Sequence, residues 1–77
     1  MHTRPISKYA AYVIGDTLGV NWSSISLDEF KRGLEIELAA TTSSFDEHIA
    51  LRLTGLIAYG HLRDQPDYYS RLVARRA

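Results

Sequence analysis

The stretch QPDYYSRL, residues 65–72, holds the side chains whose types and spacing are best suited to contacting a partner. It contains two adjacent tyrosines. Adjacent residues of a helix point about 100° apart, so the two rings cannot both face a core. Tyr69 shares one helical face with Leu72 and Val73, which predicts that it points inward. Tyr68 is then expected to be partly exposed, beside the arginines that follow.

Tyrosine and arginine are enriched among the few side chains that carry most of the binding energy of a protein interface. Both types gather near the C-terminus of this chain, with a histidine close by in sequence. We therefore predict a protein-interaction site in this region, and a protein partner. The candidate residues are Tyr59, His61, Arg63, Tyr68, Arg71 and Arg75.

The same region allows a second interpretation, in which Arg71, Arg75 and Arg76 contact the phosphates of a nucleic acid. The overall charge argues against it, because 9 basic and 9 acidic residues leave no net charge, whereas nucleic-acid-binding domains are usually basic. A helix-turn-helix is also disfavoured, since its recognition helix would present Asp46 and Glu47 to phosphate. Nucleic acid therefore stands as the alternative to a protein partner.

Neither metal binding nor catalysis is supported by the spacing of the polar residues. His48 and His61 would point about 220° apart on one straight helix, and no HExxH pattern is present. Glu35 and Glu37 also diverge, and His61 has a local partner available in Asp64 at the end of a helix. The chain has no nucleophile elbow and no glycine-rich phosphate loop. We predict no metal, no cofactor and no enzymatic activity.

The elements that must position these residues are helices. The 77 residues lack cysteine, so one domain, residues 1–77, must be stabilised by helix packing, by a partner or by self-association. No strand-like alternation persists, and no apolar run approaches the length of about 20 residues that spans a membrane. We predict an all-α, compact bundle of three to four helices, over about residues 7–18, 27–39, 45–62 and 66–75. With no signal peptide evident, we expect a cytoplasmic protein.

The first helix has clear signals at both ends. Ser7 is expected to cap its start, and Gly19 its end, where glycine readily adopts a positive φ. Gly15 lies inside this helix at a cost of about 1 kcal/mol relative to alanine, which predicts the close approach of another helix. Trp22, in the loop that follows, is expected to cover one end of the bundle.

A capping box predicts the start of the second helix. The Ser26 hydroxyl is placed to accept from the amide of Glu29, and the Glu29 carboxylate to reach back to the amide of Ser26. Two ion pairs across one turn are also expected, Asp28–Lys31 and Lys31–Glu35.

Ser44 and Glu47 offer a second capping box, at the start of the third helix. Apolar residues surround most of this helix, which predicts a place in the middle of the bundle. Three short helices cannot cover all of Leu51, Leu56 and Tyr59, so we predict a homodimer that buries the remaining apolar surface. The stripe expected to face inward comprises Ile49, Ala50, Leu53, Leu56, Ile57 and Gly60.

Pro66 separates the third helix from the fourth. The residue before a proline avoids helical geometry, and proline suits the first position of a helix. We therefore expect Pro66 to begin the fourth helix, with Gln65 or Asp64 as its cap.

Four pieces of the chain resemble a family of short uncharacterised bacterial and phage proteins: LGVNW at residues 18–22, SLDEF at 26–30, GLEIEL at 33–38 and GHLRDQPDYY at 60–69. The resemblance covers most of residues 7–72, and its last motif is the most specific. It implies a small helical domain in a bacterium or a phage, and it carries over no activity. The chain departs from the family's ELEHG pattern at residues 37–41, which read ELAAT, so a polar site there is not expected.

These observations lead to one expected function and one alternative. We expect a non-enzymatic protein-interaction module, which in a phage or mobile element would serve as an inhibitor or regulator of a larger host complex. The alternative is a nucleic-acid-associated accessory protein that uses the C-terminal arginines.

Overall fold

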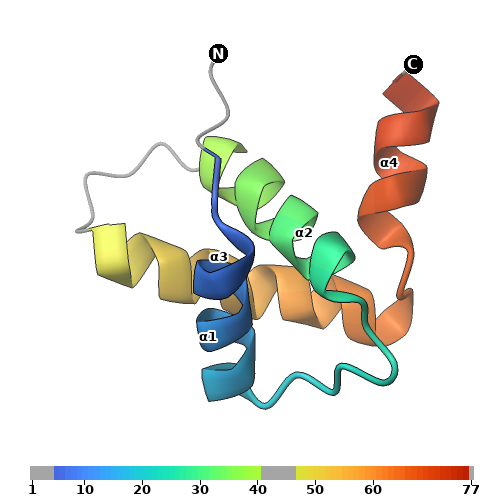
Figure 1. Ribbon diagram of the computed structural model, residues 1–77. Helices are drawn as coiled ribbons and strands as arrows, with labels where there is room; N and C mark the ends of the chain where they lie inside the picture. The colour runs from blue at the N-terminus through green and yellow to red at the C-terminus, as the bar shows by residue number, and fades with distance from the viewer. Residues whose placement is uncertain (1–4, 41–46, 77) are drawn as a thin grey trace.

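The computed structural model describes residues 5–40 and 47–76, with side chains described up to residue 40 and from 49 to 75. It contains four helices, α1 (Lys8–Leu18), α2 (Leu27–Ala40), α3 (Glu47–Asp64) and α4 (Tyr68–Arg76), and the described residues contain no strand (Figure 1). The Cα radius of gyration is 11.6 Å, close to the value of about 11.5 Å for a compact chain of this length. The predicted all-α fold is confirmed. None of these four helices has the length and apolar character needed to cross a membrane, within the residues described.

Both ends of α1 follow from local sequence, as predicted. The Ser7 hydroxyl accepts a hydrogen bond from the amide of Ala10, which otherwise has no partner in the first turn. Gly19 has φ 84°, and its amide donates to the carbonyl of Asp16. The next amide, that of Val20, donates to Gly15, which completes a Schellman motif.

Gly15 makes room mainly for a side chain of the following loop, and the helix that we expected nearby also approaches, since a Cβ here would lie 3.1 Å from the Phe30 ring of α2. A Cβ atom at this position would lie 2.7 Å from Cζ2 of Trp22, closer than real Cβ atoms come. The Trp22 ring stacks on Tyr12, with centroids 5.7 Å apart, and meets Phe30 edge-on. Trp22 therefore reaches from the loop to pack against the core, and its ring lies so close to α1 that position 15 must be glycine.

The second helix begins at the expected place, but only half of its capping box forms. The Ser26 hydroxyl accepts from the amide of Glu29 at 3.0 Å. The Glu29 carboxylate, however, bonds to Ser70 of α4 instead of returning to Ser26. The expected reciprocal bond is therefore wrong, because a residue far away in sequence competes for the same carboxylate.

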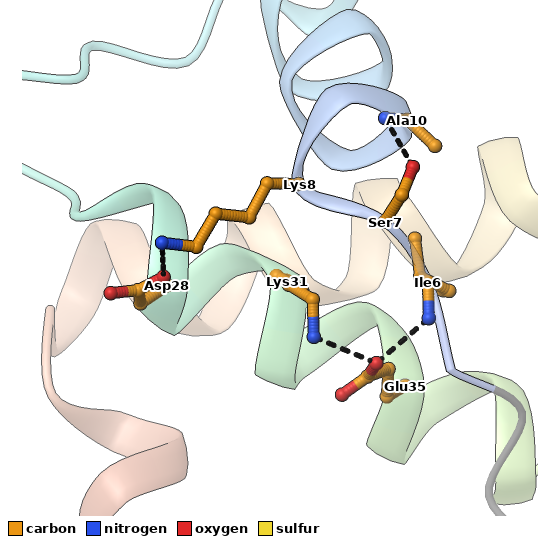
Figure 2. A network of polar contacts seen from close by, with 7 residues as sticks. All are labelled: Ile6, Ser7, Lys8, Ala10, Asp28, Lys31 and Glu35. Carbon is orange, nitrogen blue, oxygen red and sulfur yellow. Dashed lines mark hydrogen bonds and ion pairs between the residues drawn. The ribbon is translucent and has the colours of Figure 1, made fainter.

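The segment before α1 is held on α2 through Glu35 (Figure 2). One carboxylate oxygen of Glu35 accepts from the amide of Ile6 at 2.8 Å and from Nζ of Lys31 at 3.0 Å. The expected Lys31–Glu35 pair is confirmed. Asp28 pairs with Lys8 of α1 at 3.2 Å, where a pair with Lys31 was expected.

The helix in the middle of the bundle is α2, and not α3 as we predicted. It packs against each of the other three helices (Figure 1). The inward face of α3 consists mainly of small residues, because its neighbours come close. A Cβ at Gly55 would lie 3.0 Å from Ile14 and Leu18 of α1. The buried residues of α3 are Ala50, Thr54, Gly55, Ala58 and Leu62.

The stripe of α3 that we expected to face inward is mostly exposed, with Ala50 as the exception. The exposed members are Ile49, Leu53, Leu56, Ile57 and Gly60, while Leu51 and Tyr59 are partly buried. Large aliphatic residues cannot fit where α1 crosses at Gly55, so the helix turns its small residues inward. Ser44 and its expected capping box lie outside the described residues.

The fourth helix begins two residues later than expected. Pro66 and Asp67 form a turn, and the first helical residue is Tyr68, whose amide donates to the carbonyl of Gln65. The carbonyl of Asp67 accepts from the amide of Arg71. Asp67 therefore takes the position before the helix that we assigned to Gln65 or Asp64.

Candidate protein-interaction surface

The α4 helix packs on α2 through three α2 residues that are spaced four apart, Glu29, Gly33 and Glu37. Glu29 at the start of this line is buried, with 6% of its surface exposed. Its carboxylate accepts from the amide of Ser70 at 2.8 Å and from the Ser70 hydroxyl. Ser70 lies in the first turn of α4, where amides have no acceptor within their own helix. Glu29 thus caps α4 from another helix, and its negative charge suits that end of the helix dipole.

Tyr69 fills the middle of the contact between α2 and α4. Its side chain is fully buried, as predicted, and its ring lies against Gly33, where a Cβ would be 2.5 Å away. The Tyr69 hydroxyl donates to Oε2 of Glu37 at 2.7 Å. Burial, and then the neighbouring Glu37, raise the pKa of Tyr69 above its usual range. The hydroxyl is therefore a permanent donor and cannot act as a base near neutral pH.

Tyr68 is held in place by His61, the last aromatic side chain of α3. The two rings are parallel, 5° apart in orientation, and their centroids are separated by 4.2 Å. His61 also meets Tyr69 edge-on, and its Nε2 lies 3.8 Å from Oε2 of Glu37. His61 thus turns toward α2 and α4, where we had expected Asp64 to be its partner. Tyr68 is partly exposed, as predicted.

Two arginines extend this aromatic pair along α4. Arg71 and Arg75 line a hollow of about 80 Å³ together with Tyr68, Gln65 and Leu72. With its amide oxygen turned toward Arg71, Gln65 accepts from that guanidinium group. The hollow combines apolar, aromatic and cationic walls. We call the set His61, Tyr68, Arg71 and Arg75 the α4 surface.

The other two predicted residues, Tyr59 and Arg63, lie elsewhere. Tyr59 is two positions from His61, so the two side chains leave α3 about 200° apart. The guanidinium carbon of Arg63 lies 5.6 Å from the centroid of the Tyr59 ring, and the Tyr59 hydroxyl donates to the carbonyl of Gly19. Both line a separate hollow of about 230 Å³, with Asn21, Ser24, Ile25, Leu62 and Pro66. The single predicted site is therefore two.

The sequence analysis missed the residues that hold the α4 surface in place. Glu29 was assigned only to the cap of its own helix. Glu37 and Ser70 were assigned to no site. Arg32 was also missed, although its guanidinium donates to the Ser70 hydroxyl at 3.0 Å. A usable signal exists in the four-residue spacing of Glu29, Gly33 and Glu37, which places two carboxylates beside a glycine on one helix face.

The remaining candidates give no further site. The side chain of Arg76, a residue of the nucleic-acid alternative, lies outside those the structure describes. Among described residues, no three or more histidine, aspartate or glutamate side chains are placed to hold a metal ion.

These four helices and their surface define a small all-helical domain whose C-terminal helix is locked onto α2. The chain belongs to a family of proteins of unknown function, DUF5661, whose model matches residues 11–74. The match runs from α1 into α4, so it includes His61, Tyr68 and Arg71 of the α4 surface, whereas Arg75 lies one residue beyond its end. Comparison with curated proteins and with solved structures found no match. The prediction of a family without a known activity is confirmed, and the particular motif pattern stays a prediction.

Proposed function

We propose that this chain is a non-enzymatic protein-interaction module that contacts its partner through the α4 surface. The observation that carries the proposal is the parallel stack of Tyr68 on His61, which is partly exposed and flanked by Arg71 and Arg75. A ring held in this way loses little conformational freedom on binding, and such pre-organised aromatic residues are typical binding hot spots.

The chemistry of the α4 surface favours a partner segment that carries carboxylates. The guanidinium groups of Arg71 and Arg75 are suited to paired hydrogen bonds with carboxylate oxygens. The hollow between them, bounded by Leu72 and Tyr68, is large enough for a small apolar group. An acidic segment with an apolar side chain next to its carboxylates fits both features.

A non-enzymatic role is supported by what the buried polar groups already do. Glu29 accepts two bonds from Ser70, and Glu37 accepts one from Tyr69. Tyr69 itself is kept protonated by burial, since its pKa is raised. These groups stabilise the packing of α4, and such roles are those of structural residues.

A more specific form of the proposal is an inhibitor or regulator of a larger complex, encoded by a bacterium, phage or mobile element. A small domain with one rigid surface is suited to blocking a surface of a larger machine. Capture of the tagged chain from a bacterial lysate, with and without nuclease, tests the proposal. A protein recovered equally in both samples supports it, and the identity of that protein tests the inhibitor role.

The second candidate is nucleic-acid association, and one observation favours it. Tyr68, Arg71 and Arg75 line the same hollow, where the aromatic ring can stack on a base and the two cations can bind neighbouring phosphates. This alternative predicts retardation of single-stranded DNA or RNA that weakens steeply with salt and is lost when Arg71, Arg75 and Arg76 are changed to glutamine. No retardation at low salt would eliminate it.

A further inference from the structure

The outward face of α3 carries an unbroken apolar stripe. Four large aliphatic side chains there keep about half of their surface exposed: Ile49 at 50%, Leu53 at 43%, Leu56 at 54% and Ile57 at 48%. Single exposed aliphatic residues are ordinary, whereas contiguous ones mark an interaction site. We call Ile49, Leu53, Leu56, Ile57 and Gly60 the α3 stripe.

A second, mainly apolar feature lies beside α3, where residues of α1 meet Arg52. A hollow of about 220 Å³ is lined there by Val13, Ile14, Thr17, Leu18 and Arg52, and Val13 has 43% of its surface exposed. Arg52 is the charged residue of this hollow, and the stripe itself contains none. The face therefore suits an apolar partner surface.

We propose that a second copy of this chain covers the α3 stripe, with the two α3 helices packed antiparallel about a two-fold axis. A two-fold interface requires a patch that fits itself. With the axis passing near the middle of α3, Leu53 of one copy faces Leu56 of the other. Ile49 then faces Gly60, where a Cβ would have nothing within 4 Å, so the glycine leaves room for the larger side chain.

Charge and size both favour a second copy as the occupant. The chain has no formal net charge, so two copies do not repel each other at long range. The α3 helix has 18 residues and is about 27 Å long. An interface made of one helix face and its margin would bury about 1,200 Å² in total, near the lower end of the areas that specific interfaces bury. We therefore expect a weak dimer, with a dissociation constant of micromolar order.

The dimer would make the protein bivalent, and it does not depend on which partner the α4 surface binds. The α4 surface lies at the C-terminal end of α3. Antiparallel α3 helices would place the two copies of that surface at opposite ends of the dimer. A partner with two matching sites would then bind more tightly than through one surface alone.

Light scattering tests the proposal, by measuring the molar mass of the whole chain in solution over about a hundredfold range of concentration. We expect a change from monomer to dimer as the concentration rises. The Leu53→Glu variant is expected to remain a monomer throughout. Val73→Glu is the matched control, because Val73 has similar exposure, 44%, but lies on α4. A wild-type chain that is monomeric over the whole range, or a Val73→Glu variant as monomeric as Leu53→Glu, would overturn the proposal.

Paired charges test the antiparallel register. In the double variant Leu53→Glu with Leu56→Lys, each glutamate would face a lysine of the other copy, so a salt-sensitive dimer is expected to return. The double variant Leu53→Glu with Leu56→Glu should stay monomeric. Gly60→Leu gives an independent check, because the new side chain has open space in the monomer but would meet Ile49 of the second copy. A dimer unaffected by Gly60→Leu, or equal behaviour of the two double variants, would contradict this register.

Discussion

Tyr69 donates a hydrogen bond to Glu37 from a position closed off from water. An acceptor that carries charge makes such a bond stronger than one between neutral groups. Gly33, one turn before Glu37, is what permits the ring to reach that depth. At the scale of residues, the partly exposed Tyr68 owes its position to the buried Tyr69 next to it.

Removing the Tyr69 hydroxyl tests that bond. Tyr69→Phe keeps the ring but removes the hydroxyl that donates to Glu37, so we expect the free energy of unfolding to fall by about 1.5–3 kcal/mol. Urea denaturation followed by circular dichroism measures the change. Tyr9→Phe is the control, since Tyr9 is 78% exposed and its change should be close to zero. Equal stability of the two variants would show that the bond contributes nothing.

The raised pKa of Tyr69 also predicts how stability depends on pH. Above a pH of about 10, the unfolded chain releases the proton of this tyrosine, whereas the folded chain retains it. The folded state then binds more protons, so the free energy of unfolding falls as the pH rises past about 10. Tyr69→Phe should show a shallower fall over the same range, measured by urea denaturation. Parallel curves for the two proteins would contradict the assignment.

At the scale of elements, the parts predicted correctly from sequence are those that depend on neighbours in the chain. Ser7, Gly19 and Ser26 act through residues within about one helical turn, and each is found in its expected role at a helix end. The four helices follow from the same local patterns.

The errors arise where distant segments compete. The inward face of α3 could not be predicted from its own periodicity, because apolar residues occur on both of its faces. Its orientation is decided by α1, which crosses at Gly55 and leaves room only for small side chains. The Glu29 carboxylate was likewise assigned to its own helix, since nothing local indicates that Ser70 comes within 2.8 Å.

Two helical glycines provide a test of close packing between elements. Gly33→Ala would place a methyl group against the Tyr69 ring and displace α4, so we expect a loss of about 1–3 kcal/mol in unfolding free energy. Gly60→Ala has open space and should gain up to about 1 kcal/mol from helix propensity. Both are measured by urea denaturation at a concentration where the chain is monomeric. A Gly33→Ala variant as stable as Gly60→Ala would contradict the close contact.

At the scale of the whole molecule, the bundle leaves two kinds of surface for partners. The α4 surface is aromatic and cationic, and the α3 stripe is aliphatic and uncharged. More large apolar residues on the third helix than short neighbours can cover suggested a homodimer, but the sequence could not identify the face that pairs, because that depends on how α3 is rotated. Of the three residues on which that prediction was based, Leu56 belongs to the exposed stripe, whereas Leu51 and Tyr59 are partly buried.

The most direct test of the proposed interaction module is a comparison of matched variants in the capture experiment after nuclease treatment. Tyr68→Ala removes the ring of the α4 surface, and Tyr9→Ala removes an exposed ring on α1. We predict that the wild-type chain and Tyr9→Ala recover the same protein, and that Tyr68→Ala recovers about tenfold less or lower still, as expected for a hot-spot residue. Equal recovery by Tyr68→Ala, with unchanged stability, would contradict the assignment of the α4 surface.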